Sequence, residues 1–259
     1  MTYKYSTITE LPGTLVTDMQ LRRAHQRYMY AKEYCDGGNI LELGCGGGQG
    51  LELLSNNANA IIGCDIDENN LEKAKSIYSS HSKITLKNMD AEKLLLDDHS
   101  INTIILFETI YYINQVRLFF LEAYRILKQN GYIIICTANK DWPYFNPSPY
   151  SVQYYSVPEL YNIASSFGFD VKMYGSFPDF HDTTISKVIS YIKQAAIKFN
   201  VMPTTMKGKV LLKEIFIGNM VKYPDKLTED LFAYIPPSPI SHNTIDRIHT
   251  AIFAVCKKL

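Results

Sequence analysis

The sequence predicts an α/β fold built on a doubly wound, mostly parallel sheet. Three observations lead to this prediction. Short apolar runs alternate with amphipathic stretches from residue 39 to residue 137, a glycine cluster follows the first run directly, and the run Ile101–Phe107 is almost continuously apolar. Right-handed crossovers join strands that alternate with helices into a parallel sheet. A strand that is buried on both faces is apolar on both.

The remaining elements follow from the spacing of apolar residues along the chain. A helix is predicted to begin near Thr17 and to lead into the first strand. Asp67 stands where an N-cap would, ahead of apolar residues at helical spacing. Gly131 is placed to end a helix over residues 116–127. The predicted strands are Asn39–Leu43, Ala60–Cys64, Ile84–Leu86, Ile101–Phe107, Tyr132–Cys136 and Phe169–Tyr174, with a further helix over Ser156–Phe167.

Composition argues against several classes of protein. Lys and Arg number 26, as do Asp and Glu, whereas a protein that binds nucleic acid normally has a basic excess. No window approaches 18 uncharged apolar residues, so no membrane span is expected, and the N-terminus lacks the pattern of a signal peptide. The five cysteines form no C-x-x-C pair and the six histidines no metal-binding spacing. We therefore expect a cytoplasmic protein with no metal site and no nucleic-acid or membrane partner.

The segment Glu42–Gly50 is the most informative part of the chain. It follows a strand and opens a helix, so it lies at the carboxyl edge of the sheet, where open α/β folds bind ligands. The dinucleotide-binding pattern G-x-G-x-x-G fails in both registers, at Gln49 and at Leu51. No G-K-[ST] follows, so the segment is not a nucleotide-binding P-loop either.

This segment resembles the first motif of the class I S-adenosylmethionine-dependent methyltransferases, E/D-x-G-x-G-x-G. Glu42, Gly44, Gly46 and Gly48 meet the motif, and ordered signals continue the resemblance over roughly residues 25–175. The similarity is to the broad small-molecule and glycan branch of that superfamily. It implies a Rossmann-like methyltransferase fold with a seven-stranded sheet and S-adenosyl-L-methionine as the cofactor.

The resemblance assigns a part of the cofactor to each signal. Asp65 would bind both ribose hydroxyls, because a carboxylate accepts two hydrogen bonds, and Ile66 would pack on the adenine. Asp90 and Ala91 would bracket the adenine edge. Arg27 would grip the methionine carboxylate. The cofactor-binding residues implied are Arg27, Tyr28, Gly44, Cys45, Gly46, Gly48, Asp65, Ile66, Asp90, Ala91, Phe107 and Glu108.

The chain departs from the family at two places that often carry a histidine. An E-H pair past the fourth strand is replaced by Tyr111-Tyr112, and an N-P-F-H loop after the fifth strand by Ser148-Pro149-Tyr150-Ser151. A mechanism with a general-base histidine at either place is therefore in doubt. Tyr111, Tyr112 and Tyr150 are the candidate catalytic residues.

The expected function is methyl transfer to an O or N atom of a small polar metabolite or an activated sugar, by in-line displacement. Two alternatives stay open: a cofactor-binding scaffold or regulatory protein that has lost catalysis, and a nucleotide-dependent oxidoreductase. The partner would be a small-molecule or sugar acceptor, and the chain would be a monomer or a homodimer.

Four regions are predicted along the chain. Residues 1–38 form an N-terminal helical cover and residues 39–180 the cofactor-binding core, which includes an aromatic loop at 141–155. Residues 241–259 hold a closing strand, Ala251–Cys256, placed beside the sixth strand, although Ile245, Ile248 and Ile252 also permit a helix. If the strand forms, residues 181–240 are an insertion between strands 6 and 7. Helical periodicity at 183–199 then predicts a helical cap over the acceptor site.

Overall fold

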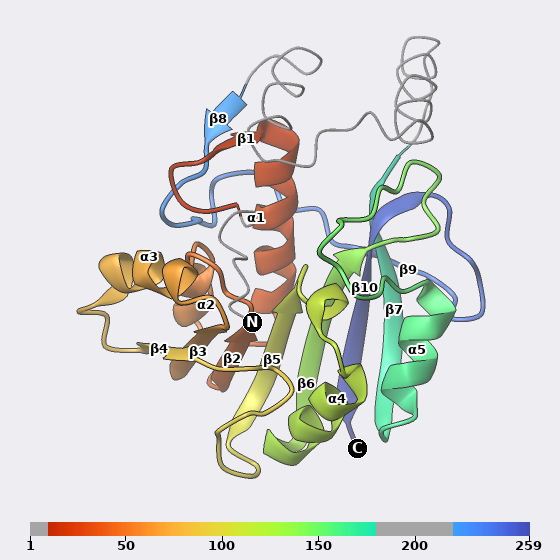
Figure 1. Cartoon of the computed structure of the whole chain (residues 1–259), viewed down its shortest axis with the longest axis horizontal. Coiled ribbons are helices and arrows are strands. Elements are labelled where there is room, and N and C mark those ends of the chain that lie inside the picture. The colour runs from red at the N-terminus through yellow and green to blue at the C-terminus, as the bar shows by residue number, and fades with distance from the viewer. Residues whose placement is uncertain (1–9, 180–219) are drawn as a thin grey trace.

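The structure is a computed structural model that describes residues 10–179 and 220–259 (Figure 1). An eight-stranded sheet in the order β4-β3-β2-β5-β6-β10-β7-β9 forms its centre, and a separate two-stranded sheet joins β1 to β8. The elements are β1 (Leu15–Thr17), α1 (Asp18–Lys32), β2 (Asn39–Leu43), α2 (Leu51–Ser55), β3 (Ala60–Asp65), α3 (Glu68–Tyr78), β4 (Ile84–Asn88), β5 (Ile101–Phe107), a 3-10 turn (Ile110–Tyr112), α4 (Val116–Ile126), β6 (Leu127–Ala138), α5 (Val157–Ser165), β7 (Phe169–Pro178), β8 (Met220–Lys222), β9 (Ser238–Pro239) and β10 (His249–Lys258).

The sheet is mostly parallel, as predicted. Strands β2 to β6 pair in parallel, and β10 lies antiparallel between β6 and β7. The predicted closing strand Ala251–Cys256 lies within β10 and pairs with β7, the predicted sixth strand, so the helical alternative for this segment is wrong. The additional eighth strand, β9, contributes only two residues, paired with β7.

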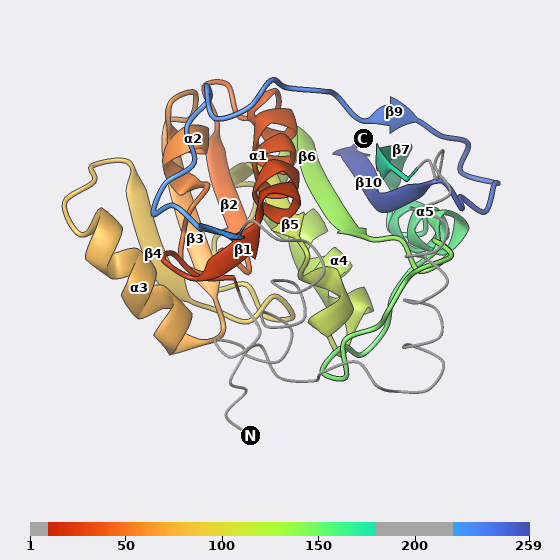
Figure 2. The same ribbon diagram turned by 90° about the horizontal axis from the view of Figure 1, so that it is seen from above.

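Two hydrophobic layers cover the faces of the sheet (Figure 2). Helices α1, α2 and α3 pack on one face, and α4 and α5 pack on the other. The strand β5 contributes to both layers, because Ile104 belongs to the α4 side and Ile105 to the α1 side, and neither side chain is exposed. Burial on both faces explains why this strand has an almost continuously apolar sequence.

Side-chain caps fix the beginnings of three helices. Thr17 and Gln20 form a capping box at the start of α1, and Ser156 and Glu159 form another at the start of α5. The Asp67 side chain accepts a hydrogen bond from the backbone N–H of Asn69 and caps α3. Such caps satisfy backbone donors that the first turn leaves without partners. The predicted helix starts near Thr17 and at Asp67 are confirmed.

The end of α4 differs from the prediction. The helix ends at Ile126 and the chain enters β6 at Leu127, so Gly131 does not end the helix. A side chain at Gly131 would place its Cβ 2.8 Å from the carbonyl oxygen of Asn102. The glycine is therefore required by the close approach of β6 to the neighbouring strand.

The segment that follows the undescribed residues lies along α1. Strand β8 pairs with β1, and the amide of Gln26 on α1 bonds the backbone of Ala233 and Ile235. Within residues 220–240 the described structure contains the strands β8 and β9 and no helix. The helical periodicity at 183–199, and residues 181–219 of the predicted insertion, lie outside the described residues.

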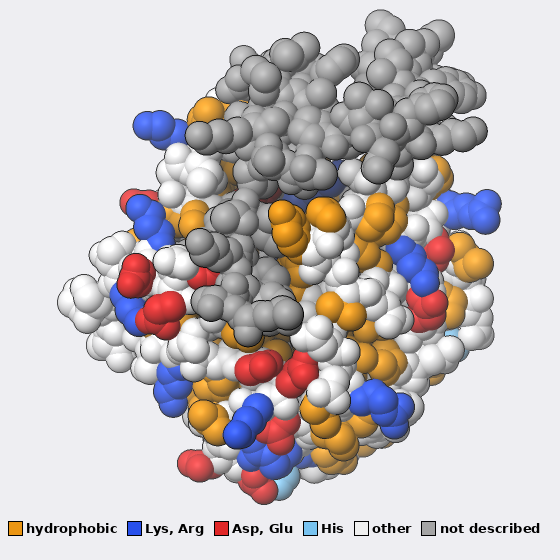
Figure 3. Space-filling view, in the orientation of Figure 1, with side chains coloured by type: hydrophobic (Ala, Val, Ile, Leu, Met, Phe, Trp, Pro, Cys, Tyr) orange, Lys and Arg blue, Asp and Glu red, His pale blue; other side chains and the backbone are white. Residues whose placement is uncertain are grey.

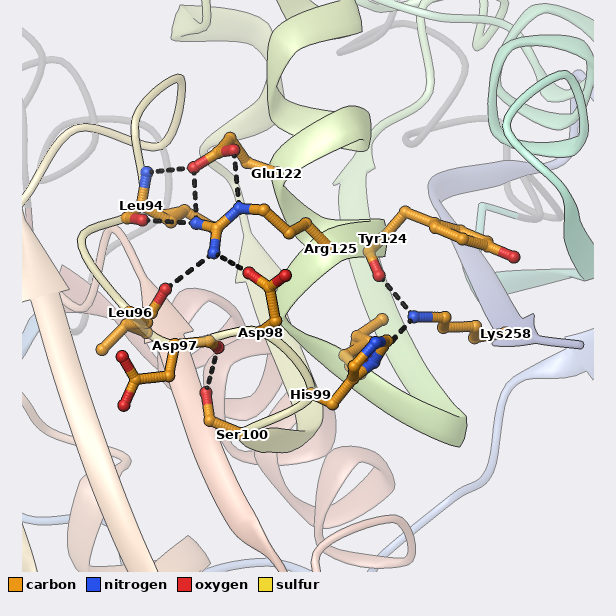
Figure 4. A network of polar contacts seen from close by, with 11 residues as sticks. Leu94, Leu96, Asp97, Asp98, His99, Ser100, Glu122, Tyr124, Arg125 and Lys258 are labelled. Atoms are coloured by element: carbon orange, nitrogen blue, oxygen red, sulfur yellow. Dashed lines mark hydrogen bonds and ion pairs between the residues drawn. The ribbon is translucent and has the colours of Figure 1, made fainter.

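Lys258 ties the last strand to the end of α4 at the edge of the sheet where β5 and β6 begin (Figure 4). Its ammonium group donates to the carbonyl oxygens of Tyr124 at 2.6 Å and Leu127 at 2.8 Å. Arg125, on the same helix, pairs with Glu122 and Asp98. The two Lys258 contacts satisfy carbonyl groups at the end of the helix, where the last turn leaves such groups without partners.

The surface carries acidic and basic side chains in close alternation over the described part of the face seen in Figure 3. This mixture agrees with the equal numbers of acidic and basic residues in the chain. Of the helices described, none has both the length and the apolar character needed to cross a membrane.

Replacing Lys258 with Ala is expected to lower the free energy of unfolding by about 2–3 kcal/mol, because two buried carbonyl groups lose a charged donor. Urea denaturation measures the change. The matched control is Lys257→Ala, since this neighbouring lysine makes no side-chain hydrogen bond among the described residues, and it should change stability by less than about 0.5 kcal/mol. Equal losses in the two variants would contradict the anchoring role.

Candidate functional site

A cavity of about 480 Å³ lies at the carboxyl ends of the parallel strands, beside the inner face of α1. Open α/β sheets bind their ligands at this edge. In Figure 1, α1 rises beyond the upper ends of the strands. The lining comprises Glu10, Gln20, Arg23, Arg27, Tyr28, Leu43, Gly44, Cys45, Gly46, Gln49, Asp65, Ile66, Asn70, Met89, Asp90, Ala91, Glu92, Phe107, Glu108, Thr109, Tyr111, Tyr112, Ile113, Asn114, Ala138, Phe177, Tyr223, Thr250 and Ala251.

The cavity brings together predicted residues from five segments of the chain, which are α1, the glycine loop and the segments that end or follow β3, β4 and β5. Every residue that the sequence predicts to bind the cofactor lines it, except Gly48. Of the three candidate catalytic tyrosines, Tyr111 and Tyr112 line the cavity. Tyr150 does not, and its side chain is 55% exposed.

Gly44 and Gly48, two of the glycines in the loop after β2, leave little room for a side chain. Gly44 has a φ of 73°, and a Cβ there would lie 2.1 Å from the hydroxyl oxygen of Thr109. Gly48 has a φ of 78°, and a Cβ there would lie 3.0 Å from the ring of Tyr78. The absence of a side chain at Gly44 therefore leaves the loop backbone exposed at the cavity wall. At Gly48 it lets the loop pack closely on α3.

Asp65 ends β3 with its carboxylate held on two sides. One oxygen accepts from the backbone N–H of Gly46 at 2.9 Å and the other from that of Asp67 at 2.8 Å. The side chain is nearly buried, and burial raises the pKa of Asp65. The glycine loop and the start of α3 thus fix the position of this acid at the cavity wall, and its oxygens retain lone pairs for a ligand.

Tyr28 and Glu42 form a buried hydrogen bond beneath the glycine loop. The Tyr28 hydroxyl donates to one carboxylate oxygen of Glu42 at 2.5 Å, and the tyrosine ring packs edge-on against Phe107 with centroids 5.3 Å apart. The other oxygen of Glu42 has no partner among the described residues. Burial raises the pKa of Glu42 to about 7, against a partly offsetting effect of the Tyr28 hydrogen bond. This pair therefore joins α1 to the strand β2.

Arg27 and Glu108 form an ion pair at the cavity wall. The distance from Nη1 of Arg27 to Oε1 of Glu108 is 2.8 Å, and Oε2 of Glu108 accepts from the Tyr111 hydroxyl at 3.1 Å. Glu108 has a φ of 48°, a conformation that costs a residue with a side chain roughly 1–3 kcal/mol. The buried Nε of Arg27 has no hydrogen-bond partner among the described residues. This nitrogen is thus a buried donor without the partner that such groups normally have.

The loop after β4 lines the cavity at the β4 edge of the sheet. Asp90 and Ala91 line the cavity there, and Asp90 accepts a hydrogen bond from the backbone N–H of Glu92 at 2.8 Å. The Glu92 carboxylate in turn accepts from the backbone of Asn114 and Gln115, just before α4. The loop is thus attached to the turn that follows β5.

Tyrosines form the wall after β5. Tyr111 lies against Tyr154 with ring centroids 4.5 Å apart, and its carbonyl oxygen accepts from the backbone N–H of Val152 at 2.7 Å. The aromatic loop 141–155 thus supports this wall from behind, and none of its residues lines the cavity. Burial raises the pKa of Tyr112 to about 12, and that of Tyr111 well above its usual value. Both hydroxyls therefore stay protonated at neutral pH and act as hydrogen-bond donors.

Several cavity residues were missed by the sequence analysis. Tyr223 comes from the segment after the undescribed residues, Thr250 from the start of β10 and Phe177 from the end of β7. No motif marks these positions. Arg23 did carry a signal, because it lies four residues before Arg27 and therefore on the same face of α1. Among residues 10–179 and 220–259, no three His, Cys, Asp or Glu side chains are grouped as metal ligands.

Comparison with known proteins identifies relatives of this chain. Residues 41–135 match a protein-family model described as "Methyltransferase domain". A probable S-adenosylmethionine-dependent methyltransferase of Mycolicibacterium smegmatis is 26% identical over 168 residues, which are 62% of this chain and 63% of that protein. A ubiquinone biosynthesis O-methyltransferase of Bartonella bacilliformis is 32% identical over 105 residues, 40% and 42% of the two chains. The chain thus spans less than two thirds of the length of these curated relatives.

Solved structures support the fold. The YcgJ protein of Bacillus subtilis superposes with a TM-score of 0.59 and 17% sequence identity, over 91% of this chain and 98% of that one. The predicted Rossmann-like architecture is therefore confirmed. Together with the sequence matches, this confirms the predicted resemblance to class I S-adenosylmethionine-dependent methyltransferases.

The buried carboxyl group of Glu42 predicts a pH dependence of stability. Its folded-state pKa of about 7 lies above the usual 4.5, so the unfolded chain releases a proton that the folded chain retains. This stabilising contribution is complete below about pH 4.5 and is lost as the pH rises through 7, by roughly 3 kcal/mol in total. Glu42→Gln removes the loss, so the stability of the variant relative to the natural chain should rise by that amount between pH 4.5 and 8.

Urea denaturation at a series of pH values measures this difference. Glutamine keeps an oxygen that accepts from the Tyr28 hydroxyl, so the contact with α1 survives the substitution. The control is Glu72→Gln, at an exposed position on α3. Its stability should depend on pH in the same way as that of the natural chain. A stability difference for Glu42→Gln that stays constant across the pH range would show that Glu42 does not titrate as stated.

Proposed function

We propose that this relative of the class I S-adenosylmethionine-dependent methyltransferases transfers a methyl group from S-adenosyl-L-methionine to an O or N atom of a small polar metabolite or an activated sugar. The observation that carries the proposal is the meeting of the glycine loop, Asp65, Asp90 and Glu108 around one cavity at the carboxyl edge of the sheet. The likeness to O-methyltransferases of ubiquinone biosynthesis supports an oxygen acceptor.

The polar groups of the cavity fit the proposed cofactor. The Asp65 carboxylate suits the two ribose hydroxyls, because both are donors. The unpartnered Nε of Arg27 suits the methionine carboxylate. Ile66 is apolar and 44% exposed at the cavity, and it suits the face of the adenine ring. We propose the same role for Asp90 and Ala91 at the adenine edge, and for Tyr28, Cys45, Phe107 and the loop glycines as the surrounding wall.

Alignment and shielding are the chain's proposed contributions to the reaction. The cofactor supplies an electrophilic methyl group on a sulfonium centre. Because positive charge disperses as the acceptor approaches such a centre, a protein gains mainly by holding the two groups in line. Tyr112 remains protonated, so its proposed role is to orient an acceptor by donating a hydrogen bond. The Tyr111 hydroxyl donates to Glu108, so its proposed role is to position that carboxylate. Tyr28 and Phe107 would exclude water from the methyl group.

A cofactor-binding scaffold is the second candidate. The observation in its favour is that no histidine of the described residues lines the cavity, so a strong general base is missing there. An acceptor that reacts as a neutral amine, or that has an acidic hydroxyl, would need no such base.

The location in the cytoplasm and the state as monomer or homodimer stay predictions.

The first prediction of this proposal concerns cofactor affinity. Asp65→Ala should weaken binding of S-adenosylhomocysteine by about 1–3 kcal/mol, or roughly 5- to 150-fold, because the ribose hydroxyls lose their acceptor. Isothermal titration calorimetry measures the affinity. Since Asp65 also holds Gly46 and Asp67, thermal unfolding of the same sample checks that the variant is folded. Asp97→Ala, at an exposed acid away from the cavity, is the control, and unchanged affinity for Asp65→Ala would refute the assignment.

Measuring the formation of S-adenosylhomocysteine distinguishes an active methyltransferase from a cofactor-binding scaffold. The natural chain is incubated with S-adenosylmethionine and a pool of hydroxylated and amino metabolites and sugars, and S-adenosylhomocysteine is measured by mass spectrometry. An enzyme should form it in an acceptor-dependent manner, and Asp65→Ala should reduce the rate at subsaturating cofactor. Tight cofactor binding without formation of the product for any acceptor would favour the scaffold.

A further inference from the structure

The cavity contains a second arginine that the cofactor does not account for. Arg23 lies one helical turn before Arg27 on α1 and lines the same cavity. Among the described residues Arg23 forms no ion pair and no side-chain hydrogen bond, and its Nε is buried without a partner. Arg27, in contrast, is paired with Glu108. The two guanidinium groups therefore differ in their need for an anion.

Phe177 holds Arg23 in place at the end of β7. The guanidinium carbon lies 5.4 Å from the centre of the Phe177 ring, within the range of a cation–π interaction. Phe177 has a φ of 56°, as unusual as the φ of 48° at Glu108, which pairs with Arg27. Both arginines are thus contacted by cavity residues in the left-handed conformation, which proteins tend to place at ligand sites. This correspondence indicates that the position of Arg23 is functional.

A second unpartnered polar group comes from β10, at the point where this strand pairs with the end of β7 that carries Phe177. Thr250, at the start of β10, lines the cavity, is only 7% exposed and has a buried hydroxyl oxygen without a hydrogen-bond partner among the described residues. Ala138 and Ala251, from the neighbouring strand ends, add little bulk. A guanidinium and a hydroxyl group without partners are donors that suit the oxygens of an acid.

The charges of the cavity favour an added anion at this end. The carboxylates whose charge acts on Arg23 are Glu108 and Asp179, and Glu108 is already bound by Arg27. Burial and the neighbouring Arg27 both lower the pKa of Arg23, which reflects the cost of its charge in this position. The cofactor would bring one carboxylate, which the unpartnered Nε of Arg27 suits. An incoming acid would offset the charge of Arg23.

We propose that the methyl acceptor carries a carboxylate or phosphate group that Arg23 binds, with Thr250 donating a second hydrogen bond. This inference rests on the proposed function, since it names the class of acceptor for the same cavity. The acid group would lie at the β6–β10–β7 end, four strand positions from the end of β3, where Asp65 lies. At ~4.8 Å per strand, the two ends are about 19 Å apart. Because such an acceptor would share a cavity of about 480 Å³ with the cofactor, it would be a small organic acid or phosphate ester.

Matched acid and neutral probes test the proposal. The full chain is saturated with S-adenosylhomocysteine and titrated by calorimetry with benzoate, phenyl phosphate and the neutral analogue benzamide. An aromatic probe suits the cavity because Phe107, Tyr111 and Phe177 line it. At least one acid should bind at least tenfold more tightly than benzamide. Arg23→Gln should remove this preference, whereas Arg23→Lys should retain part of it.

Two controls separate this inference from the proposed function. Arg22→Gln changes an exposed arginine of the same helix and should leave binding of the acids unchanged. Arg23→Gln should leave the affinity for S-adenosylhomocysteine within about twofold, whereas Arg27→Gln should weaken it at least tenfold. Failure of the natural chain to bind S-adenosylhomocysteine would refute the proposed function itself.

Three results would overturn the inference while leaving the proposed function intact. The first is binding of the acids no tighter than that of benzamide. The second is an undiminished preference for acids in Arg23→Gln. The third is a loss of S-adenosylhomocysteine affinity in Arg23→Gln equal to that in Arg27→Gln, which would assign Arg23 to the cofactor.

Discussion

Two polar contacts, one buried and one partly buried, hold α1 against the carboxyl edge of the sheet, and the cavity depends on both. Tyr28 bonds Glu42 at the end of β2, and Arg27 pairs with Glu108 directly after β5. Apolar packing is non-directional, so it fixes the rotation of α1 about its axis less precisely than these two contacts do. The contacts select the rotation of α1 that points Arg23 and Arg27 into the cavity.

The core of the fold was predictable because its signals are local. The strands Asn39–Leu43 and Ile101–Phe107 were predicted with the bounds that the structure has, and Asp67 caps α3 as expected. The site after these strands was also predictable, because parallel strands bring their carboxyl ends to one edge whatever the loops contain. Gly48 is the exception in the motif, since its lack of a side chain serves packing against Tyr78.

Long-range contacts account for what the sequence did not predict. Tyr223 joins the cavity because β8 pairs with β1, and these strands are about two hundred residues apart in the chain. The partner of Arg27 depends on the left-handed backbone of Glu108, which no residue pattern marks. The end of α4 was misplaced because a glycine that relieves contact with Asn102 resembles a helix stop in sequence.

The position of β10 has a consequence for synthesis of the chain. Within this sheet β10 comes after all the other strands in the chain, yet it lies between β6 and β7 and pairs with both over most of its length. Until residues 249–258 have been synthesised, β6 and β7 each present a row of free backbone groups, and such edges promote pairing with other chains. The nascent protein therefore passes through a stage in which its sheet has a gap one strand wide between β6 and β7.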